Sequence, residues 1–278
     1  EIFAGGQGVA RALVHLDMSN TTSGIGIGLV VLLLCNCNAI AHVNLSGILL
    51  CPSGAERLGG VLGGCRTLRH LYMRDCLIGA RGMHALATAL RSCEELTHLD
   101  VSDNCFYADG AEALAGQLGE WKQLTHLDLQ GNDVGDEGVE SLCKALGACG
   151  ALSHLNLSRN WIGDRGATCL AGMLSSCQCL AHLDVSRNHL RVEGVRRVEE
   201  AACGRLSDVD VSLNCTEKEL FWGVDFTRIW EAVEEEQGTG APQPPTDDTA
   251  ANEQQQQGTG AEPTADTESS GGQREAEQ

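Results

Sequence analysis

The sequence is short of positive charge. Its 278 residues include 19 Lys and Arg against 38 Asp and Glu, which gives a net charge of −19 at pH 7. Nucleic acids and anionic membranes attract basic patches, so this balance excludes both as main partners.

Long apolar runs and enzyme signatures are also missing. The most apolar run, Leu29 to Cys35, is far shorter than the roughly 20 residues of a membrane span. The sequence has no His-Glu-x-x-His zinc motif, no Walker phosphate loop and no Gly-x-Ser-x-Gly nucleophile turn. We therefore expect no enzyme, with no catalytic residue, no cofactor and no metal site.

What the sequence has instead is a repeat. The pattern L-x-H-L-D-L-S-x-N-x-I-G-D-x-G-A-x-x-L-A-x-x-L-x-x-C returns every 26 to 28 residues. Its units start at Leu13, Ile40, Leu68, Leu96, Leu124, Leu152, Leu180 and Leu206. A period in the twenties is typical of a solenoid, because a unit this small cannot bury its own apolar face without neighbours.

Each column of the repeat has a physical role. Leu124, Leu127 and Leu129 should point into the core, because side chains alternate along a strand. The asparagine column should hydrogen bond the turns, and the glycine column should allow close approach of the neighbouring repeat. Ile48 and Cys76 replace the asparagine in repeats two and three, so we expect less regular turns there. The two columns are Asn104, Asn132, Asn160, Asn188 and Asn214, and Gly26, Gly54, Gly82, Gly110, Gly138, Gly166 and Gly194.

This pattern resembles the leucine-rich repeat of the ribonuclease-inhibitor type. The resemblance covers residues 13–214. It implies an α/β solenoid, a horseshoe with parallel strands on its concave face and helices on its convex face. We predict seven repeats of about 28 residues plus a terminal strand in 13–214, after the end of a truncated repeat in 1–12.

The C-terminal region differs in composition. Aromatic residues are scarce, but four of the ten lie in one stretch, at Phe221, Trp222, Phe226 and Trp230. We predict a C-terminal cap helix in 215–235 that covers the last repeat, with a docking helix for a partner as the alternative. Residues 236–278 contain no Ile, Leu, Val, Met or aromatic residue, which predicts a disordered acidic low-complexity tail.

The cysteines follow the repeat. Of the 14 cysteines, six share one column after the helix, and Trp121 occupies the remaining place. A large Trp among small Cys residues predicts a position that is partly exposed or locally repacked. Buried thiols favour a reducing compartment, so we expect a cytoplasmic protein. An association with the cytoskeleton or a cilium is an option, because similar repeats occur in axonemal and cytoskeletal scaffold proteins. The six cysteines are Cys37, Cys65, Cys93, Cys149, Cys177 and Cys203.

Histidine forms the most unusual column, and the position two residues later is mostly Asp or Asn. Strands about 4.8 Å apart would stack these into a His ladder beside an acidic ladder. Three interpretations compete: surface residues kept by repeat duplication, a contact face for a protein, or metal binding, although a flat ladder offers no closed site. Stacked charges lower a His pKa and nearby Asp raises it, so we expect the face to change charge sharply between about pH 7 and 5. The His column is His15, His42, His70, His98, His126, His154 and His182.

We predict a non-enzymatic protein–protein interaction module or scaffold that binds its partner on the concave face. A monomer is expected. The candidate partner-binding residues are the exposed strand columns with aromatic and Arg anchors. They are His70, Tyr72, Arg74, His98, Asp100, His126, Asp128, His154, Asn156, Arg159, Trp161, His182, Asp184 and Arg187.

The family resemblance leaves alternatives open. Ribonuclease inhibitors use such repeats to grip a basic enzyme, and the expected acidic concave face is compatible with a basic protein partner here. Innate-immune receptors carry similar repeats beside a nucleotide-binding domain. Ran GTPase-activating proteins combine them with an acidic C-terminal region, although the tail here lacks a long Asp/Glu run.

Overall fold

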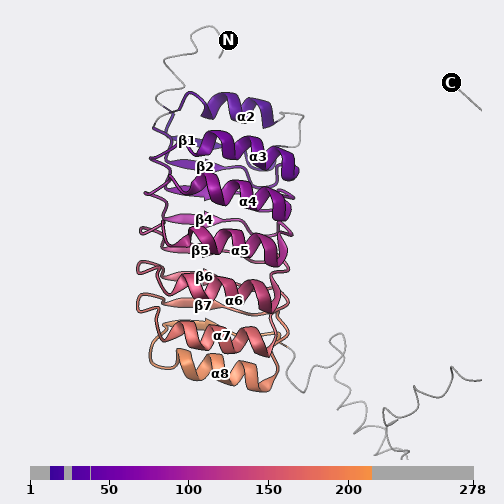
Figure 1. The fold of residues 1–278 in the computed structure, drawn as a ribbon, viewed down its shortest axis with the longest axis vertical. Coiled ribbons are helices and arrows are strands. Elements are labelled where there is room, and N and C mark those ends of the chain that lie inside the picture. Colours follow the sequence, from indigo (N-terminus) through magenta and orange to yellow (C-terminus); the bar gives the residue numbers. More distant parts are fainter. Residues whose placement is uncertain (1–12, 22–26, 38, 215–278) are drawn as a thin grey trace, which may run out of the picture. The chain divides into compact units, whose positions relative to one another are not determined.

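The computed structural model describes residues 13–21, 27–37 and 39–214, which form alternating short strands and helices (Figure 1). The predicted truncated repeat (1–12), cap helix (215–235) and acidic tail (236–278) lie outside the described residues. The strands are β1 (His15–Asp17), β2 (His42–Asn44), β3 (His70–Tyr72), β4 (His98–Asp100), β5 (His126–Asp128), β6 (His154–Asn156), β7 (His182–Asp184) and β8 (Asp208–Asp210). The helices are α2 (Ile27–Leu34), α3 (Cys51–Leu62), α4 (Gly79–Leu90), α5 (Tyr107–Leu118), α6 (Gly135–Leu146), α7 (Asp164–Leu174) and α8 (Val192–Ala202).

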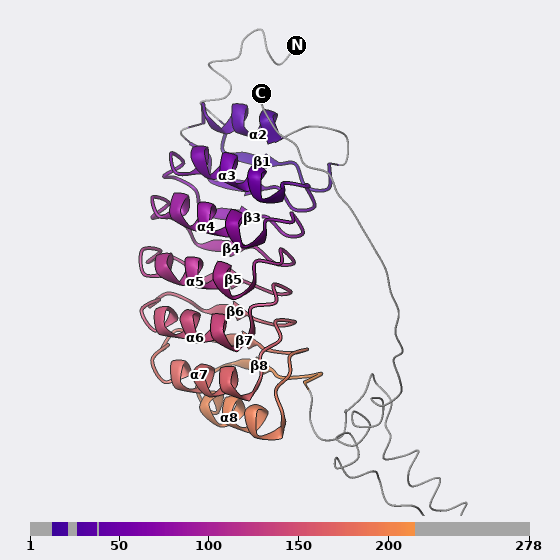
Figure 2. The ribbon, with the colours of Figure 1, turned by 45° about the vertical axis from the view of Figure 1, so that its right-hand side comes forward.

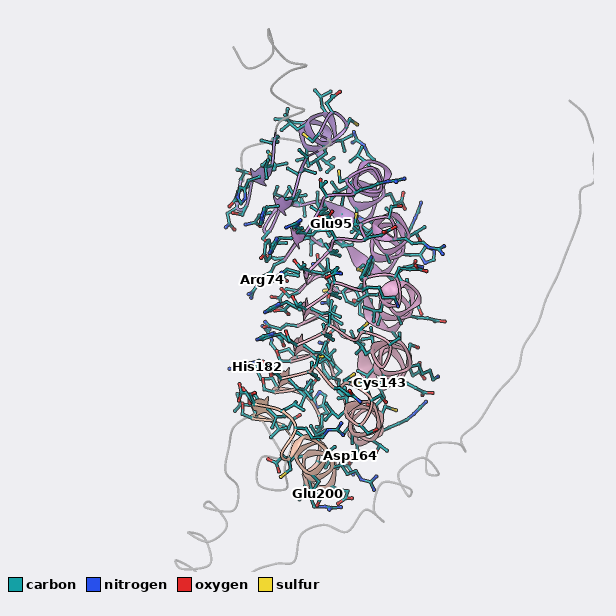
Figure 3. All side chains as sticks on the ribbon, turned by 90° about the vertical axis from the view of Figure 1, so that its left-hand side faces the viewer. Arg74, Glu95, Cys143, Asp164, His182 and Glu200 are labelled. Carbon is teal, nitrogen blue, oxygen red and sulfur yellow. The ribbon has the colours of Figure 1, made fainter. Side chains whose placement is uncertain are left out.

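The strands form one parallel sheet in chain order, from β1 to β8. The register is one repeat, so His126 pairs with His154 and Asp128 with Asn156. The helices line one side of this sheet (Figures 1 and 2), and their row bows outward, which leaves the strand side concave (Figure 3). The predicted α/β solenoid is confirmed. None of the described helices has the length and apolar character to cross a membrane.

The core lies between the sheet and the helices. Leu124, Leu127 and Leu129 are at most 2% exposed, as the alternation of the strand predicts. Leu142 and Leu146, one turn apart on α6, are fully buried against them. Burial of such leucines contributes about 2 kcal/mol each, which makes every repeat depend on its neighbours.

The glycine column marks where successive helices meet. A Cβ added at Gly138 would lie 2.5 Å from Val134 Cγ1 and 3.0 Å from Ala111 Cβ in the preceding helix. No carbon atom fits at that distance, so only glycine allows the helices to approach this closely. The prediction for this column is confirmed at Gly138.

A ladder of buried asparagines holds the turns together. Asn104 accepts the backbone N–H groups of Cys76 and Ile78 through Oδ1, at 3.0 and 3.2 Å. Its Nδ2 donates to the carbonyl oxygens of Met73, Val101 and Ser102, and its own backbone N–H donates to the next asparagine, Asn132. Each amide therefore ties its own turn to the turn before it.

Cys76 takes the place of an asparagine in repeat three. Its thiol donates to Leu45 O at 3.2 Å, which is the carbonyl position that Asn104 Nδ2 reaches in the next repeat. The turn keeps the left-handed backbone of its neighbour, with φ of 54° at Asp75 and 54° at Asp103. The prediction of a less regular turn at Cys76 is wrong, because a thiol can replace one donor of the amide.

Trp121 also departs from expectation. Its side chain is only 1% exposed, so of the two predicted alternatives a partly exposed position is wrong and local repacking remains. The indole Nε1–H donates to Leu90 O at 2.9 Å. Cys93 and Cys149 donate their thiols to the equivalent carbonyls of Leu62 and Leu118. Trp121 therefore keeps the hydrogen bond of the cysteine column while it fills more volume.

Candidate functional site

The outward side chains of the strands line an open hollow of about 410 Å³, which we call the strand face. It is lined by the His column, by the column two residues later and by the strand leucines between them. Among the described residues, no Lys or Arg lines it. The polar residues of the strand face are Tyr72, His98, Asp100, His126, Asp128, His154, Asn156, His182, Asp184, Asp208 and Asp210.

The histidine rings of this face are stacked. From His42 to His182, neighbouring ring centroids lie 4.0 to 4.3 Å apart, with interplanar angles of 11° to 25°. The stack loosens at the N-terminal end, where the rings of His15 and His42 are 5.4 Å apart and tilted by 37°. The register of the parallel sheet produces this stack, because it sets one ring beside the next at the strand spacing.

Hydroxyl groups orient the central rings. Thr97 Oγ1 donates its proton to Arg69 O at 2.9 Å, so its oxygen accepts from His98 Nδ1–H, also at 2.9 Å. Thr125 holds His126 in the same way, through Thr97 O. These contacts fix the tautomer with the proton on Nδ1, which leaves Nε2 as an unprotonated acceptor.

Ser153 extends this arrangement by one repeat. Its hydroxyl donates to Thr125 O at 3.0 Å and lies 2.8 Å from His154 Nδ1. Arg69 precedes His70, so no hydroxyl group is available there, and the buried Nδ1 of His70 has no hydrogen-bond partner among the described residues. The sequence prediction missed Thr97, Thr125 and Ser153. A hydroxyl residue directly before the histidine in three successive repeats was the signal that could have revealed them.

Burial lowers the pKa values of the central histidines. It is the largest cause at His70, His126 and His154, followed by charge on other rings of the stack. At His98 the same two causes lower the pKa from 6.5 to about 4. The predicted sharp change of charge between pH 7 and 5 is wrong for His98, because burial and the neighbouring rings outweigh the nearby Asp residues.

A proton-NMR titration should show this directly. We expect His98 to gain its proton near pH 4, well below a free imidazole at about 6.5. The unfolded chain takes up these protons first, so the free energy of unfolding should fall as the pH drops from about 6.5 toward 4. The His98→Gln variant assigns the lowest-titrating resonance. Titration of that resonance at or above pH 6.5 would contradict the buried, stacked arrangement.

The acidic column is held by its own turns. Asp100 Oδ1 accepts the backbone N–H of Ser102 at 2.9 Å, and Asp184 Oδ1 accepts that of Ser186 at 2.8 Å. Asp128 accepts the Nδ2 of Asn156 at 3.2 Å, and burial raises the pKa of its carboxyl group. Within the described part of the chain the hydrogen bonds of Asp100 and Asp184 go to Oδ1, so their second carboxylate oxygens can accept donors from a partner.

The end of the sheet adds two residues that are not among the predicted binding residues, although Asp210 continues the predicted acidic column. Asp208 and Asp210 on β8 line the strand face, and Asp208 Oδ2 lies 3.9 Å from His182 Nδ1. Here the His column ends in a carboxylate, since His182 pairs in register with Asp208. The shorter last repeat hid this, because its strand lacks the histidine.

The predicted site residues divide between two surfaces. His70 and the Tyr, His, Asp and Asn candidates lie on the outward columns of β3–β7. Arg159, Trp161 and Arg187 do not line the strand face, which corrects their predicted placement. They follow β6 and β7 and line a second hollow of about 660 Å³. Arg74 extends from the turn after β3, and its guanidinium lies 2.9 Å from Asp103 Oδ2 (Figure 3).

We call this second surface the turn face. It is made by the turns that follow the strands, and its residues carry charges of both signs. They are Asp75, Leu77, Asp103, Cys105, Gly131, Asp133, Arg159, Trp161, Arg187, His189 and Leu213.

The described residues form neither a metal site nor a disulfide. No three His, Cys, Asp or Glu side chains of the described residues are grouped closely enough to hold a metal ion. The described cysteines have free thiols. Burial raises the pKa values of Cys65 and Cys149 to about 11, so these two thiols are poor nucleophiles at neutral pH.

Three solved structures illustrate the likeness to known proteins. The tropomodulin C-terminal domain of Caenorhabditis elegans is 13% identical with a TM-score of 0.44, over 53% of this chain and 90% of that one. Leiomodin-1 actin-binding site 2 is 19% identical with a TM-score of 0.45, over 66% and 94%. An internalin of Listeria monocytogenes is 15% identical with a TM-score of 0.46, over 76% and 58%.

All three TM-scores lie below 0.5, so the family assignment rests on the repeats themselves. No curated protein sequence shows a significant match to the chain. A family model described as "Leucine Rich repeat" matches residues 64–87, 92–115, 123–143, 152–171 and 176–197. These segments follow the period of the strands and helices of the structure. The chain is a leucine-rich-repeat protein.

Proposed function

We propose that this chain is a non-enzymatic interaction module that binds a protein partner on its strand face. One observation carries the proposal: the strand face presents hydrogen-bond acceptors and carboxylates in ordered columns, with no Lys or Arg among them. The Nε2 atoms of His98, His126 and His154 accept, because hydroxyl groups hold their Nδ1 protons. Such a surface complements a partner that supplies donors.

The chemistry favours a basic partner. Asp100, Asp184 and Asp210 add negative charge along the same face, and Lys or Arg side chains of a partner would meet both charge and acceptors. From β3 to β8 the face spans about 24 Å, at about 4.8 Å per strand. A wide, open surface of this kind suits a protein better than a small molecule, which needs an enclosing pocket.

The type of repeat and the cellular compartment are part of the same proposal. The 28-residue period supports the ribonuclease-inhibitor type of repeat. The free thiols of the described cysteines support a reducing compartment such as the cytoplasm.

Charge reversal on the two sides of the sheet tests the proposal. The full-length chain with Asp100→Lys, Asp128→Lys and Asp184→Lys serves as bait beside the wild type, and retained proteins are identified by mass spectrometry. The matched control carries Glu112→Lys, Glu137→Lys and Glu199→Lys on the exposed helix side, with the same change in charge. We expect the strand-face variant to lose basic proteins that the wild type and the control retain.

A more conservative variant controls for misfolding of the Lys variant. Asp100→Asn, Asp128→Asn and Asp184→Asn remove the charge but keep an oxygen for the turn hydrogen bonds of Ser102 and Ser186. The affinity of any retained protein should fall about tenfold or more, because several charge-assisted contacts are lost together. Equal affinity for the wild type and both strand-face variants would remove this face as the binding site.

A further inference from the structure

The turn face offers a second site that the strand face does not explain. Position 159 and position 187 are one repeat apart, and each follows its strand by three residues. Both carry Arg, whereas the equivalent positions of earlier repeats carry Asp75, Asp103 and Gly131. The C-terminal end of the turn face is therefore basic, and its N-terminal end is acidic.

The two guanidinium groups form only one long ion pair within the described part of the chain. Arg159 Nη1 lies 3.9 Å from Asp103 Oδ1, at the limit of an ion pair, and its side chain is 54% exposed. Arg187 is exposed and has no ion pair with any residue in the described part of the chain. Adjacent strands are about 4.8 Å apart, so the two Arg side chains can reach the same carboxylate or two neighbouring ones. Guanidinium and carboxylate pair in a bidentate geometry.

An apolar surface adjoins these arginines. Trp161 is 63% exposed, and its ring centroid lies 4.7 Å from that of His189. Leu213, which is 56% exposed, lines the same hollow. An exposed Trp beside Arg is the composition of an interface anchor, because both side chains contribute much of the binding energy in protein complexes.

The backbone holds these side chains in place. Arg159 and Trp161 both adopt left-handed backbone angles, with φ of 57° and 59°, which costs roughly 1 kcal/mol for each residue. Asn160 between them is fully buried, and its Nδ2 donates to Leu129 O and Ser158 O. The anchors therefore extend from a turn that the asparagine ladder fixes, which limits the entropy lost on binding.

From this geometry we infer that the C-terminal half of the turn face binds an acidic segment of a partner protein. Carboxylates of that segment pair with Arg159 and Arg187, and an apolar side chain beside them packs on Trp161 and Leu213. Charge complementarity selects this occupant, because the strand face is acidic and the anchors of the turn face are cationic. The two faces can then hold parts of opposite charge at the same time.

A defined peptide tests this site on the full-length chain. The probe is fluorescein-labelled Glu-Glu-Phe-Glu-Glu-Phe-Glu-Glu, and binding is measured by fluorescence anisotropy at low salt. We expect Arg159→Glu with Arg187→Glu to weaken binding at least tenfold, and Trp161→Ala to weaken it about fivefold. Thermal unfolding followed by circular dichroism accompanies each variant, and Arg187→Glu alone serves where the double variant does not fold.

Matched controls separate this site from a general effect of charge. Arg66→Glu with Arg91→Glu changes the net charge equally in a hollow near the ends of the helices and should leave peptide binding unchanged. Equal loss in this control, or unchanged binding in the turn-face variants, would overturn the inference. Tighter peptide binding after Glu234→Gln, Glu235→Gln and Glu236→Gln would also overturn it, because the chain's own acidic segment would then be the occupant.

Discussion

Replacing Asn104 by Ala is expected to lower the free energy of unfolding by about 4 kcal/mol, because it orphans several buried backbone groups at once. The side chain is fully buried. Its Oδ1 accepts from Cys76 N and Ile78 N, and its Nδ2 donates to three carbonyl oxygens. Ala supplies none of these bonds, and water cannot enter a closed turn without displacing its packing.

Asn104→Cys is the matched control, since the chain already uses this substitution at Cys76. A thiol there should again donate to the carbonyl of the preceding repeat, as Cys76 does to Leu45 O. We expect Cys to cost less than half of what Ala costs. Urea unfolding followed by circular dichroism measures both variants. Equal losses, or a loss below about 1 kcal/mol for Ala, would contradict the role of the asparagine ladder.

Trp121→Ala is the second large expected effect, at about 4 kcal/mol, because it removes the largest fully buried side chain of the described residues. The loss combines the buried area of the indole, the cavity that remains, and the lost hydrogen bond from the indole to Leu90 O. A repeat weakened this much should uncouple its neighbours, so the unfolding transition should also broaden.

Trp121→Phe separates volume from hydrogen bonding. Phe keeps most of the apolar contact but cannot donate to Leu90 O, so we expect a loss of about 1 to 2 kcal/mol. Thermal unfolding at one pH compares the variants. If Ala and Phe cost the same, the hydrogen bond rather than the packing dominates, and the interpretation of Trp121 as a core residue is wrong.

The regular part of the fold could be predicted, because apolar residues alternate along each strand and the whole pattern returns about every 28 residues. Leu124, Leu127 and Leu129 follow the alternation of a strand, and Gly138 follows from the close approach of helices. The sequence left two alternatives open for Trp121, partial exposure and local repacking, because the size of a residue does not tell whether neighbouring side chains make room for it. The hydrogen bond to Leu90 O becomes visible only in three dimensions.

The backbone conformation at the helix starts also could not be predicted from the repeat pattern. Gly135 N donates to Asn160 O of the following repeat, and Gly135 has a φ of 63°. At the equivalent Gly163 the amide instead donates to Asp136 Oδ1 of the preceding repeat, at 2.7 Å, and the backbone is extended. The Asp136 carboxylate therefore turns the amide of Gly163 toward the preceding repeat, whereas the amide of Gly135 faces the following repeat. A consensus pattern averages this difference away, so it predicts a uniform turn.

The candidate site was predicted in composition but not in placement. The His and Asp columns of the strand face follow from register alone, since His98 must lie beside His126 in a parallel sheet of constant period. Arg159 and Trp161 were assigned to the same face from their residue types. Their left-handed backbone, which the sequence does not reveal, moves them onto the turn face.

The two tyrosines of the chain offer the most direct measurement of the central claim, that the strand face binds the partner. Tyr72 lines the strand face, whereas Tyr107 begins α5 and is 54% exposed. Photoreactive benzoylphenylalanine replaces each in turn in the full-length chain. We expect a partner retained by the wild type to cross-link from position 72 and not from position 107. Cross-links from position 107 with none from position 72 would contradict the account.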